Sequence, residues 1–267
     1  MRACLSYFKM SLINGFQYRV AAWAGVFTQF FWGFMEIQLY RALYTDHAAA
    51  FPMALEGLVS YIWLRQAFLA LLNSWTFEGD LLEMIRSGSI AYELCRPVSL
   101  YGMWFARNAA VRLSRAAMRC LPILLVAALL PAPWGIRPPA SLAGFGAFIL
   151  SLALTLGVTV AYTLIVYFTC FYTVSSEGVR AVLVPLTDFL SGGIIPLPIM
   201  PGWLSGILRF SPFGAMLNAP LRIYGGDIAG MALIETLLLQ LFWLLALGGL
   251  GYALQRNGMK RLCVQGG

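Results

Sequence analysis

Residues 142–172 read LAGFGAFILSLALTLGVTVAYTLIVYFTCFY, an apolar run without an acidic or basic side chain. A helix needs about 20 apolar residues to cross a bilayer, so this run can span it and tilt or extend beyond it. Of the 267 residues, 60% are hydrophobic and 11% are charged, whereas soluble domains are about 45–50% apolar and about 25% charged. The composition therefore predicts a single integral membrane domain with room for about six spans.

Working outward from this run, similar stretches predict an all-α, polytopic membrane protein with six transmembrane helices. The N-terminal residues 1–19 differ from the spans, because Leu5, Phe8, Leu12 and Phe16 recur at spacings of three and four between basic residues. That pattern is typical of an interfacial helix along the inner membrane surface. The expected spans are residues 20–44, 53–77, 104–130, 142–172, an interrupted span that begins at residue 181, and 228–254.

The basic residues are distributed unequally between the two ends of these spans. Most of the 18 Lys and Arg border the N-terminus, residues 78–103, residues 173–180 or the C-terminal tail. Because basic residues are enriched in cytoplasmic loops, both termini are predicted to be cytoplasmic, in the inner (plasma) membrane. The opposite side receives only Arg41, Arg137, Arg209 and Arg222.

The fifth span is interrupted by SGGIIPLPIMPGW, residues 191–203. Pro196, Pro198 and Pro201 cannot lie in an uninterrupted helix. Backbone that is not helical is tolerated at membrane depth only where protein or a wet cavity surrounds it. We interpret residues 181–226 as a span that breaks and re-enters from the outer side, with residues 196–226 as the hairpin. A span followed by a surface loop remains the alternative.

Residues 78–103, EGDLLEMIRSGSIAYELCRPVSLYGM, form the longest polar stretch and are predicted to be cytosolic. Acidic residues precede a basic one, an order that suits the helix dipole, and apolar residues form a stripe. Such a short amphipathic helix can anchor to the membrane surface or occupy a groove on a partner, and the residues alone do not decide between these roles. The acids are Glu78, Asp80 and Glu83, the base is Arg86, and the stripe is Leu81, Met84 and Ile85.

The sequence lacks the motifs of several activities. It has no HExxH, no phosphate loop and no metal-ligand spacing among its five cysteines, and its only histidine is His47. The net charge of +7 lies beside apolar runs and does not indicate nucleic-acid binding. We therefore expect no catalytic residue, metal or cofactor in this chain, and any ATP with its Mg²⁺ must be bound by another chain.

Polar residues within the spans allow two interpretations. Glu36, Arg65 and Asp188 could relay ions, as in an ion-coupled secondary transporter or channel. They could instead join helices, through an Arg65–Glu36 or an Arg65–Asp188 pair, and we favour this second interpretation. An intramembrane enzyme built on Asp188 and Ser191 is a further alternative, although a histidine partner is lacking.

Two strings carry a resemblance to a known family. YELCRPVSLYG (residues 92–102) and FLSGGIIPLPIMPGWLSGILRFSPFGAMLNAPLRIYGG (residues 189–226) resemble the type-2 ABC exporter permeases, in particular their short six-span members. The resemblance implies a second permease, identical or homologous, and two copies of a separate ATPase beneath the pair. It also implies outward movement of cargo, as in multidrug efflux. Because the spans carry few fixed charges, amphipathic or hydrophobic cargo is expected.

The resemblance also implies roles for particular residues. A coupling helix within 78–96 would sit in a groove of the ATPase, and residues 1–19 would be the connecting helix. The hairpin 196–226 would shape the outer gate. The coupling residues would be Glu78, Asp80, Leu81, Glu83, Met84, Arg86 and Arg96, and the gate residues Gly192, Gly193, Pro196, Pro198, Pro201, Trp203, Pro212 and Phe213.

Overall fold

The computed structural model describes residues 2–17, 19–47, 51–74, 76–173 and 176–261. Within these ranges the chain forms helices and turns and no strand, so the all-α prediction is confirmed. The first half contains α1 (Arg2–Gly15), α2 (Arg19–His47), α3 (Leu55–Ala67), α4 (Leu69–Leu72), α5 (Gly79–Arg86), α6 (Ala91–Leu94) and α7 (Leu100–Leu129). The second half contains α8 (Leu142–Thr169), α9 (Ser176–Ser191), η2 (Leu197–Ile199), α10 (Gly202–Phe210), α11 (Pro212–Met216), α12 (Asn218–Gly225), α13 (Met231–Gly258) and η3 (Met259–Arg261).

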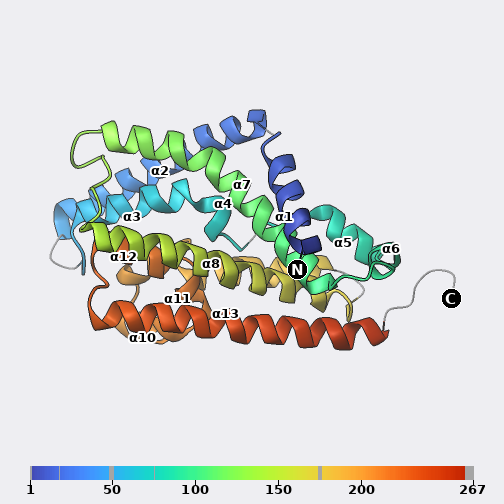
Figure 1. Ribbon diagram of the computed structural model, residues 1–267. Helices are drawn as coiled ribbons and strands as arrows, with labels where there is room; N and C mark the ends of the chain where they lie inside the picture. The colour runs from blue at the N-terminus through green and yellow to red at the C-terminus, as the bar shows by residue number, and fades with distance from the viewer. Residues whose placement is uncertain (1, 18, 48–50, 75, 174–175, 262–267) are drawn as a thin grey trace.

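The long helices α2, α7, α8 and α13 run lengthwise through the molecule (Figure 1). The start of α1, the short helices α5 and α6 and the end of α13 lie at one end, at the right of the view, and the connection between α7 and α8 lies at the other. Helix α1 crosses the long helices steeply and packs against α7. The segments that the basic residues mark as cytoplasmic are thus gathered at one end.

Among the described residues, two helices are long and apolar enough to cross a membrane by length and composition, namely α8 and α13. Helix α7 is long enough, but it carries Arg107, Arg112, Arg115 and Arg119 in its first two thirds. The second expected span, 53–77, is shorter in the structure, where α3 and α4 end at Leu72. The six-span topology therefore stays a prediction.

Local sequence explains where the two central helices begin. The Ser99 hydroxyl accepts a hydrogen bond from the Gly102 N–H at 3.3 Å at the start of α7, and Ser141 accepts one from the Gly144 N–H at 2.9 Å at the start of α8. These N-caps satisfy backbone donors that the first helical turn leaves free. They fix the residue at which each helix begins, and therefore which side chains of α7 and α8 face the rest of the protein.

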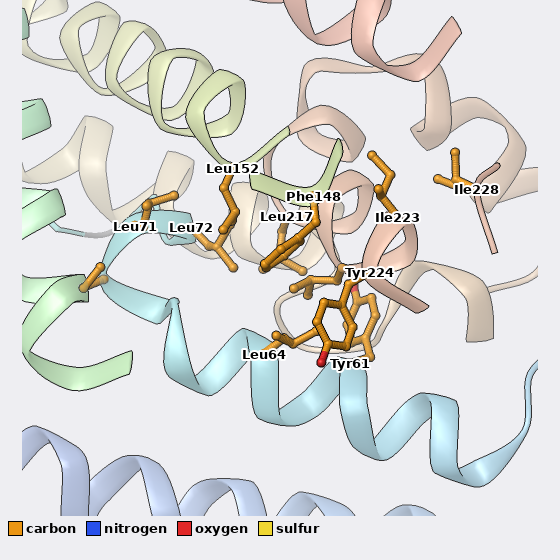
Figure 2. Close-up of a cluster of buried hydrophobic side chains, with 13 residues drawn as sticks. Tyr61, Leu64, Leu71, Leu72, Phe148, Leu152, Leu217, Ile223, Tyr224 and Ile228 are labelled. Carbon is orange, nitrogen blue, oxygen red and sulfur yellow. The ribbon is translucent and has the colours of Figure 1, made fainter. Parts of the chain in front are cut away.

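The core contains a cluster of apolar side chains contributed by α3, α4, α8 and α12. Figure 2 shows Leu64, Leu72, Phe148 and Leu152 converging with Tyr224 between these helices. A polar contact joins α8, α11 and α13, where the fully buried Gln240 amide donates to the Ala215 carbonyl at 2.9 Å. Its oxygen accepts from the Ser151 hydroxyl at 2.9 Å. Such contacts support the interpretation of intramembrane polar residues as links between helices.

Candidate functional site

The segment that begins at Glu78, predicted to be cytosolic, turns its apolar stripe into the protein. Leu81 on α5 is completely buried and packs in a cluster with Trp104 of α7 and with Tyr167 and Phe168 of α8. Met84 and Ile85 pack against the same cluster, although both remain partly exposed. The stripe is therefore used within this chain, and Leu81 is not available to a membrane surface or to a partner's groove.

Polar contacts fix the beginning of the segment to α7 and α8. The Glu78 N–H donates to the Tyr167 hydroxyl at 2.6 Å, and the Arg107 guanidinium bonds to the Glu78 carboxylate at 2.6 Å. Arg107 also pairs with Asp80. Burial raises the pKa of Glu78 above its ordinary value, and the neighbouring Arg107 offsets part of that rise. Further along, the Trp104 indole donates to the Glu93 carboxylate at 3.0 Å.

The outer face of the segment is polar. Glu83 and Arg86 form an ion pair at 2.9 Å, with side chains 57% and 76% exposed. Arg96 is also exposed, and it lies 4.0 Å from Glu93. Of the predicted coupling residues, Glu83, Arg86, Arg96 and the exposed Asp80 could reach a partner, whereas Glu78 and Leu81 face inward. The coupling role itself stays a prediction.

Arg112 lies on α7 and is buried within the protein, although it belongs to a run of basic residues. It is 0% exposed and donates four hydrogen bonds. Two go to the Asn73 carbonyl at 2.6 Å and the Thr76 carbonyl at 3.2 Å, in the connection between α4 and α5. The others reach Asn108 at 2.8 Å and Thr163 at 3.0 Å. Arg112 therefore ties that connection to α7 and α8.

Of the two helix pairs considered for Arg65, the structure forms the pair with Glu36. The buried Arg65 guanidinium on α3 binds the Glu36 carboxylate on α2 and the Gly193 carbonyl just beyond α9. Asp188 lines the same cavity without an ion pair or a side-chain hydrogen bond to another described residue. Arg65 thus connects the first half of the chain to the interruption after α9.

Two neighbouring cavities lead from the cytosolic segment to this pair. The larger, about 770 Å³, lies between α1, α2, α4, α5 and α7 and includes Glu78 and Arg107 in its wall. The second, about 500 Å³, reaches Glu36, Arg65 and Asp188. The two cavities adjoin, because Leu69, Asn73 and Arg119 line both. A third, about 440 Å³, lies beside Pro198 and Arg222 and shares no lining residue with them.

The interruption of the fifth helix begins before its prolines. The Gly192 N–H bonds to the Phe189 carbonyl at 3.2 Å, and the Gly193 N–H to the Asp188 carbonyl at 2.8 Å, with Gly192 at φ 90°. This is the Schellman arrangement, in which a left-handed residue, usually glycine, ends a helix. The sequence interpretation credited the break to the prolines, whereas α9 has already ended at Ser191.

The predicted gate residues are distributed over the elements that follow. Pro196 and Pro198 flank the buried Leu197 in and before η2, and Pro201 precedes α10. Trp203 on α10 is exposed. Pro212 occupies the first turn of α11, and the Phe213 ring meets the Tyr162 ring edge-on with centroids 6.1 Å apart. Whether this region re-enters the membrane is not shown, and the hairpin stays a prediction.

The part of the chain that the structure describes holds no group of three metal-ligating side chains. The side chain of His47 and all of Cys263 fall outside it. Sequence reasoning also missed two members of the cavity wall, Arg115 and Arg119, because it assigned them only to the cytosolic charge balance. Their spacing of one helical turn was the available signal.

The fold is helical, and two adjoining internal cavities lie beside the segment that the sequence predicts to be cytosolic. Residues 59–266 match the family described as "ABC-2 family transporter protein". The match covers most of the chain, and the chain therefore belongs to this family, as a membrane permease of the ABC transporter class and not its ATPase. Neither the curated proteins nor the solved structures contain a match to it.

Proposed function

We propose that this chain is the permease of an ATP-driven exporter that moves amphipathic or hydrophobic cargo outward across the inner (plasma) membrane. In this proposal it pairs with a second permease, identical or homologous, and two copies of a separate ATPase dock beneath the pair. ATP and Mg²⁺ are bound by those ATPases. Both termini face the cytoplasm, as the distribution of basic residues predicts.

The observation that carries the proposal is that the cytosolic segment forms part of the cavity wall. Glu78 and Asp80 belong to that segment and line the larger cavity. Arg107 holds both carboxylates to α7, so a displacement of α5 would move the wall and α7 together. The adjoining cavity ends at Arg65, which also holds the Gly193 carbonyl at the helix interruption. Force on the cytosolic side thus has a route to the region of the predicted outer gate.

The test is reconstitution into liposomes, with and without the ATPase partner. Neutral, cationic and anionic fluorescent amphiphiles serve as trial cargo, and an ATPase variant that binds but does not hydrolyse ATP is the control. We expect ATP-dependent movement of at least one amphiphile only with the active partner. Transport that proceeds without any ATPase would overturn the proposal.

Asp188 favours a second candidate, an ion-coupled transporter. Its carboxylate lines the cavity of the Glu36–Arg65 pair and forms no ion pair or hydrogen bond with another described residue. Carboxylates in such positions can bind and release protons or ions. A pH or sodium gradient would then drive transport by the purified chain alone, and Asp188→Asn would abolish it.

A further inference from the structure

Two arginines in the wall of the larger cavity form no ion pair or hydrogen bond with the described residues. Arg115 and Arg119 lie one turn apart on α7, and both line the cavity of about 770 Å³. Among the described residues, neither guanidinium forms an ion pair or a hydrogen bond, and the Arg119 Nε is buried without a partner. Cations enclosed between helices are costly unless something neutralises them.

The neighbouring charges supply only part of that neutralisation. Glu78 and Asp80 pair with Arg107, but two carboxylates face only one guanidinium there, and Glu78 also attracts Arg115 electrostatically. The three arginines and two acids of the cavity wall leave one net positive charge. At the far end of the adjoining cavity, the Glu36 carboxylate is bound by Arg65. Asp188 lines only that second cavity and makes no ion pair with Arg119. The unmatched positive charge of the larger cavity is therefore concentrated on one turn of α7.

The backbone of α2 leaves space for one of these guanidinium groups. A Cβ atom on Gly25 would lie 2.5 Å from the Arg119 Cζ and 2.8 Å from one of its terminal nitrogens. Because glycine has no Cβ, the guanidinium can lie directly against α2, where it lines both cavities. Gly25 therefore admits Arg119 in its present position.

The cavity wall also carries apolar side chains, beside polar ones such as Ser11, Asn14 and Thr76. Met10 from α1, Leu69 from α4 and Met118 from α7 line it together with Ala22 and Phe77. Helix α1, which the sequence predicts to lie along the inner membrane surface, forms one side. The cavity thus places a pair of cations next to an apolar lining at the level expected for the inner leaflet.

We propose that this cavity binds an amphipathic molecule with an oxyanion head group, such as a phosphate. Arg115 and Arg119 hold the head group, and the apolar wall holds the chain. Guanidinium groups suit this role because their donors match oxyanion geometry and stay charged. The inference rests on the proposed function and deepens it by naming the charged end of the cargo.

The experiment measures binding without the ATPase. The full chain in phosphatidylcholine nanodiscs is titrated by calorimetry with octyl phosphate, inorganic phosphate or octyltrimethylammonium, and empty nanodiscs provide the blank. We expect octyl phosphate to bind at least tenfold more tightly than either of the others. Arg115→Gln with Arg119→Gln should weaken its binding at least tenfold, because charge-assisted hydrogen bonds are lost.

Two further variants separate binding from folding. Gly25→Ala keeps every charge but displaces the Arg119 guanidinium, and it should weaken octyl phosphate binding. Arg86→Gln removes one exposed positive charge outside the cavity and should leave binding unchanged.

Unchanged binding of octyl phosphate in the double variant would overturn the inference. Equal binding of inorganic phosphate would overturn it in favour of a small anion, and equal binding of octyltrimethylammonium would exclude anion recognition. Since no ATPase is present, the binding result is independent of transport. If octyl phosphate binds as expected but ATP drives no transport in the liposome assay, the proposed function is wrong and the inferred binding site is still supported.

Discussion

Replacing Arg112 by methionine should destabilise the protein strongly. The variant removes four hydrogen bonds from a side chain that is 0% exposed. The buried Asn73 carbonyl then loses its donor, at about 1–3 kcal/mol, and the partly buried Thr76 carbonyl loses the same donor at a smaller cost. Asn108 and Thr163 lose a partner too. Relief from burying the guanidinium offsets part of this cost, since desolvating an ion costs several kcal/mol.

The net loss should be about 1–3 kcal/mol, the cost of leaving buried neutral acceptors without their donor, which is between about one and two powers of ten in the unfolding equilibrium. The assay is unfolding of the purified chain in dodecylmaltoside micelles by added dodecyl sulfate, followed by tryptophan fluorescence. Hydrogen exchange should also rise in the connection that Arg112 holds, between α4 and α5.

The matched control is Arg115→Met, on the same helix three residues later. Arg115 forms no ion pair or hydrogen bond with a described residue, so the substitution removes no such contact. Its removal should change the unfolding free energy by less than about 1 kcal/mol, as expected away from specific contacts. If Arg112→Met were as stable as Arg115→Met, the four hydrogen bonds would not be holding the segment, and the reasoning would be refuted.

Three other variants test the cytosolic segment and the helix interruption. Glu83→Lys with Arg86→Glu keeps the exposed ion pair with its charges exchanged, so folding should be unchanged. ATP hydrolysis should be uncoupled from transport. Unchanged coupling in liposomes would show that this edge is not the ATPase contact. Gly192→Ala should lower the unfolding free energy by about 1–2 kcal/mol. The φ of 90° at this position is strained for alanine, and the new Cβ would lie 2.7 Å from Leu197 Cδ1. A melting temperature equal to that of the wild type would count against this prediction. The pKa of Glu78 is raised in the folded state, so above the ordinary glutamate value of 4.5 the folded state binds more protons than the unfolded state. Stability relative to Glu78→Gln should therefore rise as the pH falls towards 4.5 and decline as the pH rises through the raised pKa. Melting temperatures at several pH values check the sign, and the opposite slope would contradict it.

Apolar patterning predicted the long helices well, because their ends depend on local residues. The expected spans 142–172 and 228–254 correspond to α8 and α13 with shifts of a few residues. The Ser141 N-cap and the polar residues after α13 are visible in the sequence. The interruption after residue 191 was also visible, although Gly192 ends the helix ahead of the prolines. A glycine and a proline in one short stretch predict the same break, and only backbone geometry separates their roles.

The site was less predictable, since its key contacts join distant parts of the chain. Arg112 lies in a basic run that resembles a cytosolic helix extension, and its acceptors include two backbone carbonyls that any residue would provide. Nothing in the sequence marks Asn73 and Thr76 as its partners. The inward direction of Leu81 depends likewise on docking against Trp104 and on tertiary packing that periodicity cannot describe.

The inward packing of Leu81 limits how an ATPase can act on this permease. Leu81 is already buried within the chain, so an ATPase would contact mainly the exposed polar edge of the segment, which includes Glu83 and Arg86. Exposed charges bind weakly in salt. A weak contact can still transmit a displacement if the segment is held rigidly against a long helix. Arg107 and Arg112 hold the segment against α7, a helix about 45 Å long. Arg115 and Arg119 follow on the same helix, so a push at α5 would reach the unmatched cations of the cavity without requiring a separate moving part.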